Sequence, residues 1–295
     1  MNPDSFKKVE LEDADELKNH YLRFPVEHSD YMHSTMMAWS HYMDYYYSWI
    51  DDSLVIMTEL ENRKRIRPPV GEFSESTFSK VIHMAGRNGL EPMVSMIGQR
   101  THEWMREKFP DLEYLSHRDY FEYVYRSDDL ADLPGKRYLK VRNYLNKFRR
   151  ENSYQVEPID QGNIEEVIQF LRRWCVKKGC DEDPFLLSER QANMYALEHM
   201  DDLGLAGITI RVGDQLEALS IHESMSDDTV VIHYEKANFD IQGLYQAINN
   251  EAALILRDRY DFINREADMG VKGLRKAKKK YGPHHMMEVF HARID

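Results

Sequence analysis

Three strand-like runs follow one another between residues 205 and 237, joined by very short turns. The runs read "LAGITIRV", "QLEALSIHES" and "TVVIHYEKA", and the connections are "GD" and "MSDD". Gly, Asp and Ser favour tight hairpin turns, so this pattern predicts three consecutive antiparallel strands. A short turn with a single glycine, Gly243, then leads into an apolar run with helical spacing that extends to about Arg257.

The segments around this meander complete a ten-element order. Residues 153–292 predict a strand, two helices, three strands, a helix, a strand, a helix and a final strand over "MMEVFHA". The second helix is expected from about Ser188, which would cap it, to Met200. This is the order of the Gcn5-related N-acetyltransferase (GNAT) fold, in which the strand before the third helix splays from its neighbour.

The first half of the chain offers the later part of the same order: a hairpin that turns at Asp51-Asp52, then helix, strand, helix and strand. With 295 residues, the chain is long enough for two domains. We expect an α/β (α+β) fold of two tandem GNAT-like domains, each a mixed, mostly antiparallel sheet flanked by helices. The expected boundaries are 1–126 for a degenerate N-terminal domain, 127–152 for a basic linker helix and 153–295 for a domain that carries the active cleft.

Three spaced motifs carry a family resemblance. They read "RSDDLADLPGKRYLKVRNYLNKFRREN", "HYEKANFDIQGLYQAINNEAA" and "FINREADMGVKGLRKAKKKYGP". They resemble an uncharacterised family similar to the C-terminal domain of phosphatidylglycerol lysyltransferases and, more distantly, the Fem-type aminoacyltransferases. The resemblance implies two acetyltransferase-like domains and transfer of an aminoacyl group from aminoacyl-tRNA. The long multi-span membrane domain of the lipid-modifying enzymes is not in this sequence, so a soluble acceptor is as plausible as a lipid.

The turn "DIQGLYQ" is the expected donor site. A helix N-terminus presents unpaired N–H groups to a phosphate, and glycine lets a ligand approach the backbone. Tyr245 stands where the usual acetyltransferase loop has a second small residue, which disfavours acetyl-CoA. The structural alternative is that Asp240 caps the helix and Gly243 forms a tight turn. The predicted donor-binding residues are Gln242, Gly243, Leu244, Tyr245, Arg275 and Lys276.

Carboxylates at strand ends are the candidates for a catalytic base. The two-residue period of a strand brings His233 and Glu235 to one face, and Glu223 on the preceding strand is the rival of Glu235. Lys278 could steady the oxyanion of acyl transfer, and the hydroxyl of Tyr281 could protonate the leaving group. The alternative for each of these residues is an ordinary solvated or salt-bridged charge.

The net charge of -12 argues against a general nucleic-acid coat protein. Two basic segments nevertheless stand out, residues 135–150 and 272–282. The first could receive an RNA acceptor stem, or it could be an amphipathic helix with aromatic core residues. The start of the chain has no signal-peptide pattern and no apolar run is long enough to span a membrane, so we expect a cytoplasmic protein with peripheral membrane contact at most.

Metal and covalent chemistry have no positive signal. The histidines show no zinc spacing, and Cys175 and Cys180 are interpreted as ordinary thiols, so no metal and no permanently bound cofactor are expected. The leading hypothesis is an acyltransferase or aminoacyltransferase that uses acyl-CoA or aminoacyl-tRNA as donor and an amine or hydroxyl as acceptor. The alternative is an inactive acetyltransferase-like module that binds RNA or a phosphorylated metabolite.

Overall fold

The structure is a computed structural model that describes residues 5–87 and 89–294. The first four residues, the last residue and Asn88 lie outside it. The chain forms two compact units: unit 1 ends at Glu122 and also includes the segment from Met287 onward, whereas unit 2 is Tyr123–Met286. These limits differ from the expected ones because the basic helix belongs to unit 2 and the C-terminal strand to unit 1.

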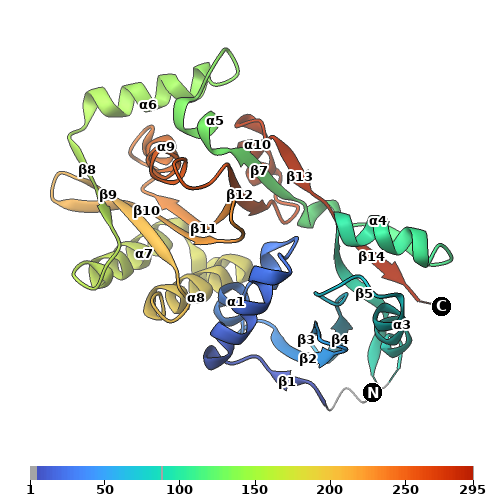
Figure 1. The fold of residues 1–295 in the computed structure, drawn as a ribbon. Helices are drawn as coiled ribbons and strands as arrows, with labels where there is room; N and C mark the ends of the chain where they lie inside the picture. The colour runs from blue at the N-terminus through green and yellow to red at the C-terminus, as the bar shows by residue number, and fades with distance from the viewer. Residues whose placement is uncertain (1–4, 88, 295) are drawn as a thin grey trace. The chain divides into compact units, whose positions relative to one another are not determined.

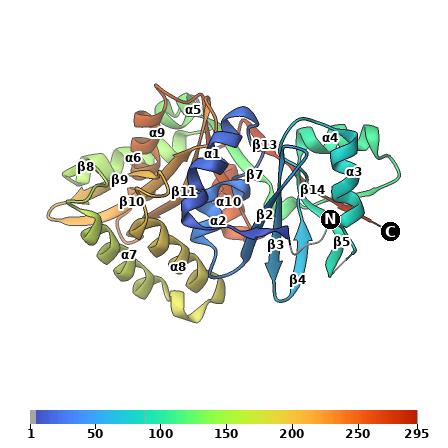
Figure 2. The same cartoon turned by 60° about the horizontal axis from the view of Figure 1, so that its bottom comes forward.

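Unit 1 is built on a seven-stranded sheet. Its strands, in spatial order, are β1 (Lys7–Lys8), β2 (Asp44–Ile50), β3 (Ser53–Leu60), β4 (Arg63–Ile66), β5 (Leu90–Gly98), β14 (Val289–Arg293) and β6 (Glu113–Ser116). Its helices are α1 (Ala14–Arg23), α2 (His33–Ala38), α3 (Glu75–Met84) and α4 (Gln99–Lys108), and α3 and α4 pack on β5 (Figure 2). The β2–β3 hairpin confirms the predicted turn, since Asp51 and Asp52 have positive φ values of 48° and 62°.

Unit 2 repeats this architecture. Its seven strands, in spatial order, are β13 (His285–Met287), β7 (Glu122–Arg126), β12 (Phe262–Ala267), β11 (Thr229–Ala237), β10 (Gln215–Ser224), β9 (Ala206–Val212) and β8 (Tyr154–Pro158). Its helices are α5 (Ser127–Asp132), α6 (Leu139–Glu151), α7 (Ile164–Lys178), α8 (Pro184–Glu198), α9 (Leu244–Leu256) and α10 (Lys272–Lys280). In Figure 1, α9 covers one face of β9–β11 while α7 lies on the other, in agreement with their packing on the sheet.

The two sheets confirm the tandem repeat. Each unit runs strand, two helices, three strands, helix, strand, helix, strand, so unit 1 contains the whole order and not only its later part. Each sheet is completed by a seventh strand, and these two strands are exchanged. The strand β7 follows β6 in the chain but pairs within the sheet of unit 2, whereas β14 follows β13 and lies between β5 and β6 of unit 1. The prediction of one strand over "MMEVFHA" was therefore wrong, because the chain changes sheets at Glu288.

Helix boundaries follow local capping chemistry. The helix α3 begins where the Ser74 side chain accepts from the Thr77 N–H. The helix α8 begins at Pro184, four residues before the predicted Ser188, because Asp183 accepts from the first-turn N–H groups and proline suits the first turn. The helix α6 buries Val141, Leu145 and Phe148 in the core of unit 2, so the linker helix is an integral part of that unit.

Candidate functional site

The parallel strands β11 and β12 pair only over their first three residues and then diverge. Their register runs from Thr229↔Phe262 to Val231↔Asn264, while β11 continues to Ala237 and β12 to Ala267. This is the splay expected before the third helix of the repeat. The diverging ends carry the polar and charged side chains of His233, Glu235, Arg265 and Glu266, although the surrounding core is apolar. The ladder therefore opens where most of the predicted catalytic side chains lie.

His233 lies between two carboxylates. The register of β10 and β11 skips His233, which is the extra residue of a β-bulge, so the strict alternation expected for His233 and Glu235 is interrupted. Its Nδ1 is 2.8 Å from Glu266 Oε1 and its Nε2 is 3.3 Å from Glu223 Oε2. Burial alone lowers the pKa of His233, but the hydrogen bonds to Glu223 and Glu266 outweigh it and raise the pKa to about 10. The imidazolium is charged at neutral pH, and Glu223 is one of its two counter-ions.

Glu235 belongs to a second buried pair. Its carboxylate accepts from Arg265 Nη2 at 2.7 Å and from Asn249 Nδ2 at 3.3 Å. The side chains of Glu235 and Arg265 are only 10% and 14% exposed. The Arg265 guanidinium also lies 5.2 Å from the ring centroid of Tyr281. Burial raises the pKa of Tyr281 to about 12, so its hydroxyl keeps the proton that an acid catalyst needs.

Two atoms beside Glu235 have no hydrogen-bond partner among the described residues. Ser220 lies directly opposite Glu235 in the β10–β11 register, and its buried Oγ is unpaired. Asn249 Oδ1 on α9 is likewise buried and unpaired. Sequence reasoning missed Ser220 and Asn249, and it placed Arg265 at a strand end without assigning it a role. For the first two, only the asparagine pair in the apolar helical run "AINNEAALIL" gave a signal.

Lys278 caps the end of β12. Its Nζ donates to the carbonyls of Arg265, Glu266 and Ala267 at 2.5, 3.0 and 2.6 Å. The backbone there is unusual, because Glu266 has a φ of 56°. All three ammonium protons therefore have backbone acceptors, and the oxyanion role of Lys278 stays a prediction that requires these bonds to rearrange.

Arg275 is also bound within the protein, by a carboxylate. It forms a two-point contact with Asp268 at 2.8 and 2.7 Å, and Asp268 also accepts from the Tyr123 hydroxyl at 2.6 Å. Burial raises the pKa of Asp268, but the hydrogen bonds, led by that of Arg275, outweigh it and lower the pKa to about 2. The charge of Arg275 is thus balanced within the protein, while Lys276 on the same helix is exposed.

Gly243 is the N-cap residue of α9 with a φ of 89°. A Cβ at this position would stand 2.3 Å from the Tyr144 carbonyl oxygen of α6. Close packing of α9 on α6 therefore accounts for the glycine, whereas the structural alternative explained it by a tight turn alone. Asp240 does not cap the helix, which was the other part of that alternative, because it pairs with Lys177.

The other predicted residues of the donor turn differ in accessibility. Gln242 is exposed and its side-chain oxygen accepts from Lys147 Nζ. Leu244 is fully buried, so it can offer a ligand only its backbone. Tyr245 is partly buried, and burial raises its pKa. The structure brings these residues together at the start of α9, while their role in donor binding stays a prediction.

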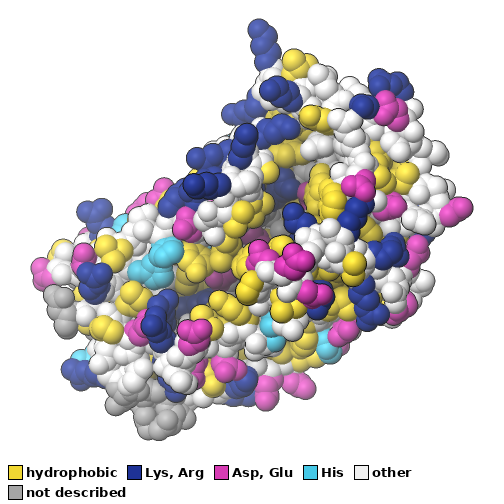
Figure 3. Space-filling view, turned by 180° about the vertical axis from the view of Figure 1, so that it is seen from behind, with side chains coloured by type: hydrophobic (Ala, Val, Ile, Leu, Met, Phe, Trp, Pro, Cys, Tyr) yellow, Lys and Arg dark blue, Asp and Glu magenta, His cyan; other side chains and the backbone are white. Residues whose placement is uncertain are grey.

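A basic surface lies on α6, α10 and the turn before α6. Lys280 lies 5.3 Å from the ring centroid of Tyr144, and Arg137 donates to the Gly282 carbonyl, so the two helices are neighbours. Figure 3, which views the molecule from the side opposite to Figure 1, shows Lys and Arg side chains gathered in its upper part. Within residues 5–87 and 89–294, no acidic partner is found for the exposed side chains of Lys136, Lys140, Lys272, Lys276 and Lys279.

Solved structures share this fold along the whole chain. A conserved protein of unknown function from Bacteroides thetaiotaomicron is 30% identical with a TM-score of 0.93, and the match covers 100% of both chains. L-PGS from Bacillus licheniformis is 13% identical with a TM-score of 0.65 over 98% of this chain and 93% of that one. FemX is 8% identical with a TM-score of 0.63 over 96% of each chain. These likenesses confirm the expected fold.

Sequence comparison assigns the family. An uncharacterised protein of Mycoplasmoides gallisepticum is 22% identical over 65% of this chain, which spans 61% of that relative's length. Among the described helices, none combines the length and apolar character needed to cross a bilayer. Residues 23–293 match the family described as "Phosphatidylglycerol lysyltransferase, C-terminal". Its two units have the GNAT-like fold, and the chain belongs to the phosphatidylglycerol lysyltransferase C-terminal family.

Proposed function

We propose that this protein transfers an acyl or aminoacyl group from an activated donor to an amine or hydroxyl acceptor. Membership of the family supports a transferase of this kind. The observation that carries the proposal is the buried cluster of Glu235, Arg265 and Tyr281 at the splay between β11 and β12. It places a carboxylate and a protonated phenol near each other in a poorly solvated part of unit 2.

The proposed chemistry is direct transfer. The acceptor nitrogen or oxygen attacks the carbonyl carbon of the donor, and its proton passes to Glu235 or, in the rival assignment, to Glu223. The bond from that carbon to the ester oxygen or thioester sulfur then breaks, and the Tyr281 hydroxyl donates a proton to the leaving atom. Proton return from the carboxylate to the phenolate restores both groups. Arg265 would steady charge in this cluster, a role that replaces part of the one predicted for Lys278.

The donor is either an aminoacyl-tRNA or an acyl-CoA. The basic surface of α6 and α10 supports an RNA donor, because lysines without acidic partners are suited to neutralise phosphates. Tyr245 in place of a small residue and the packing of Gly243 against α6 argue against a coenzyme A pyrophosphate in the usual loop. The donor would reach the N-terminus of α9 near Gln242. The proposal keeps a cytoplasmic location and no permanently bound cofactor.

A donor panel tests the proposal. Purified protein is incubated with mixed aminoacyl-tRNAs or acyl-CoAs and an amine and hydroxyl acceptor panel, and transfer is followed by mass spectrometry. Glu235→Gln should lower the rate by about 10²-fold or more, in the range for loss of a general base. Glu217→Gln, a carboxylate change elsewhere on the same sheet, serves as the matched control and should keep the rate. Equal rates in Glu235→Gln and wild type would remove Glu235 as base.

A binding module is the second candidate, because Arg275 is held by Asp268 and Lys278 by backbone carbonyls. In that case RNA would bind to the basic surface without turnover. Binding is measured by fluorescence anisotropy with uncharged tRNA, as a function of salt. Retained binding with no transfer across the whole donor and acceptor panel would favour the module over the enzyme.

A further inference from the structure

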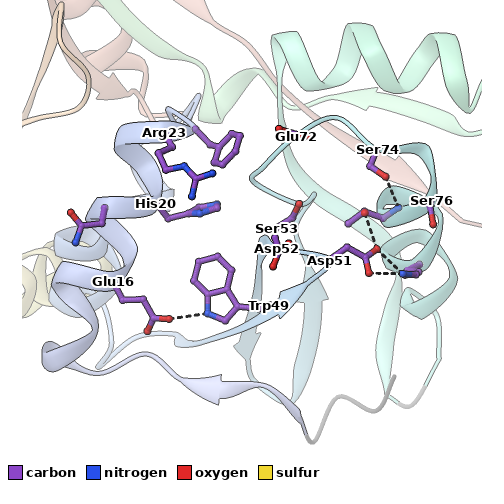
Figure 4. A pocket seen from close by; sticks show the side chains of 14 residues that line it. Glu16, His20, Arg23, Trp49, Asp51, Asp52, Ser53, Glu72, Ser74 and Ser76 are labelled. Carbon is purple, nitrogen blue, oxygen red and sulfur yellow. Dashed lines mark hydrogen bonds and ion pairs between the residues drawn. The ribbon is translucent and has the colours of Figure 1, made fainter.

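Unit 1 contains a cavity of about 950 Å³ that is remote in sequence from the cluster around Glu235. It lies between α1, the β2–β3 turn and the start of α3 (Figure 4). Figure 4 shows His20 and Trp49 on one side of the space, with Asp52 and Ser53 across from them. A cavity of this volume is large enough for a small organic molecule.

Aromatic rings form one wall of the cavity. His20 on α1 and Phe24, which directly follows that helix, have ring centroids 5.0 Å apart, and His20 meets the Trp49 ring edge-on at 4.8 Å. The Trp49 indole N–H donates to Glu16 at 3.0 Å, which fixes the ring beside a carboxylate. Aromatic faces next to carboxylates are the surroundings in which proteins hold organic cations.

The charges of the lining favour a cation. Asp51 is balanced by Lys80 at 2.6 Å, and Arg23 lies over the Phe24 ring. Three further lining carboxylates have no cationic partner among residues 5–87 and 89–294, namely Glu16, Asp52 and Glu72. The lining therefore carries an excess of negative charge that an incoming cation would neutralise.

Ser53 places a hydroxyl group in the lining of the cavity. The residue is only 3% exposed. Gly71 packs closely against it, because a Cβ there would stand 2.3 Å from Ser53 Oγ. A serine hydroxyl can accept a hydrogen bond from the N–H of a ligand.

The start of α3 does not offer the usual anion site. The Ser74 hydroxyl already accepts from the Thr77 N–H, and the Thr77 hydroxyl donates to Asp51 at 2.9 Å. The carboxylate of Asp51 thus lies near the helix N-terminus, where a phosphate would otherwise bind. An anionic ligand would meet this charge and those of Asp52 and Glu72.

We propose that this cavity binds an organic cation, an alkyl chain that carries a protonated amine. The chain would lie along the Trp49 and Phe24 rings, while the ammonium group would meet Asp52 or Glu72 and the Ser53 hydroxyl. The site belongs to unit 1 and is separate from the transfer chemistry proposed for unit 2.

Calorimetric titration of the full chain with cadaverine and with spermidine tests the site. Both amines should bind, and added salt should weaken the affinity. The triple variant Glu16→Gln, Asp52→Asn, Glu72→Gln should bind at least about tenfold more weakly. The matched control Asp15→Asn, Glu75→Gln changes neighbouring carboxylates outside the cavity and should bind as the wild type does.

A single substitution covers the case in which the triple variant does not fold. Asp52 is exposed in a left-handed turn position that asparagine tolerates, so Asp52→Asn should keep the fold and lose affinity. Absence of amine binding to the wild type at millimolar concentration would overturn the proposal. Equal affinity in the triple variant, or tighter binding of inorganic phosphate than of either amine, would also overturn it.

Discussion

Substitution of Gly243 by alanine distinguishes a structural joint from a ligand-contact glycine. The residue has a φ of 89°, and an added Cβ would meet the Tyr144 carbonyl oxygen at 2.3 Å and Phe148 Cβ at 2.9 Å. The first of these contacts is backbone within α6, so it cannot move without shifting that helix. If packing explains the glycine, Gly243→Ala should destabilise unit 2 whether or not a ligand is present.

The magnitude follows from three terms. A left-handed backbone costs a non-glycine residue about 1–2 kcal/mol, and overpacking costs about 1–3 kcal/mol. Removal of glycine from the unfolded chain returns about 0.4–1 kcal/mol. We therefore expect Gly243→Ala to lower the free energy of unfolding by about 1–4.5 kcal/mol.

Two other glycines separate these terms. Gly135 has a φ of 70° with nothing within 4 Å of an added Cβ, so Gly135→Ala tests backbone strain alone. Gly273 has neither a positive φ nor a close neighbour, and Gly273→Ala in α10 should stabilise by about 0.5–1 kcal/mol. The difference between Gly243→Ala and Gly135→Ala isolates the clash with α6, which we expect to be about 1–3 kcal/mol.

Urea unfolding followed by circular dichroism measures these differences, and a tRNA titration of the same variants measures donor binding. If Gly243→Ala were no less stable than Gly135→Ala, the packing explanation would be refuted. Unchanged stability combined with lost donor binding would instead show that the glycine contacts the ligand.

Three further predictions follow from the buried charges and thiols. His233 has a folded pKa of about 10 against an ordinary value of 6.5. Its contribution to stability is therefore complete below about pH 6.5 and is lost as the pH rises through 10. His233→Gln should make the urea midpoint less dependent on pH between pH 7 and 10, and an unchanged dependence would contradict the ion pairs of His233 with Glu223 and Glu266. Asp268 has a folded pKa of about 2, so its contribution to stability is present above the pKa of the unfolded state and is lost as the pH falls through 2. Asp268→Asn should lower the free energy of unfolding by about 2–3 kcal/mol at pH 7 in the same assay. An unchanged free energy would show that the ion pair with Arg275 adds no stability. Cys175 and Cys180 are buried free thiols, and burial raises the pKa of Cys175 to about 12, so a Cys175→Ala, Cys180→Ala variant should keep transfer activity. Loss of that activity in a folded double variant would refute direct transfer.

Local chemistry made much of the fold predictable. The hairpin at Asp51-Asp52, the meander of β9, β10 and β11, and the capped start of α3 all depend on residues a few positions apart. Sequence spacing also placed Glu235 on its strand and Lys278 on its helix, while Tyr281 directly follows that helix. It did not show what each side chain contacts, since Lys278 meets backbone carbonyls 11–13 residues away and Glu235 meets Arg265 30 residues away.

The sequence by itself determined the type and order of the elements, because propensity, capping and hydrophobic period act over a few residues. Only the tertiary structure decided which sheet takes β7 and which takes β14, because the residues of a strand do not specify the distant strand with which it pairs. The tertiary structure also explained why residue 243 is a glycine. Its φ could be expected from a short turn, but its close approach to Tyr144 depends on a helix a hundred residues earlier in the chain.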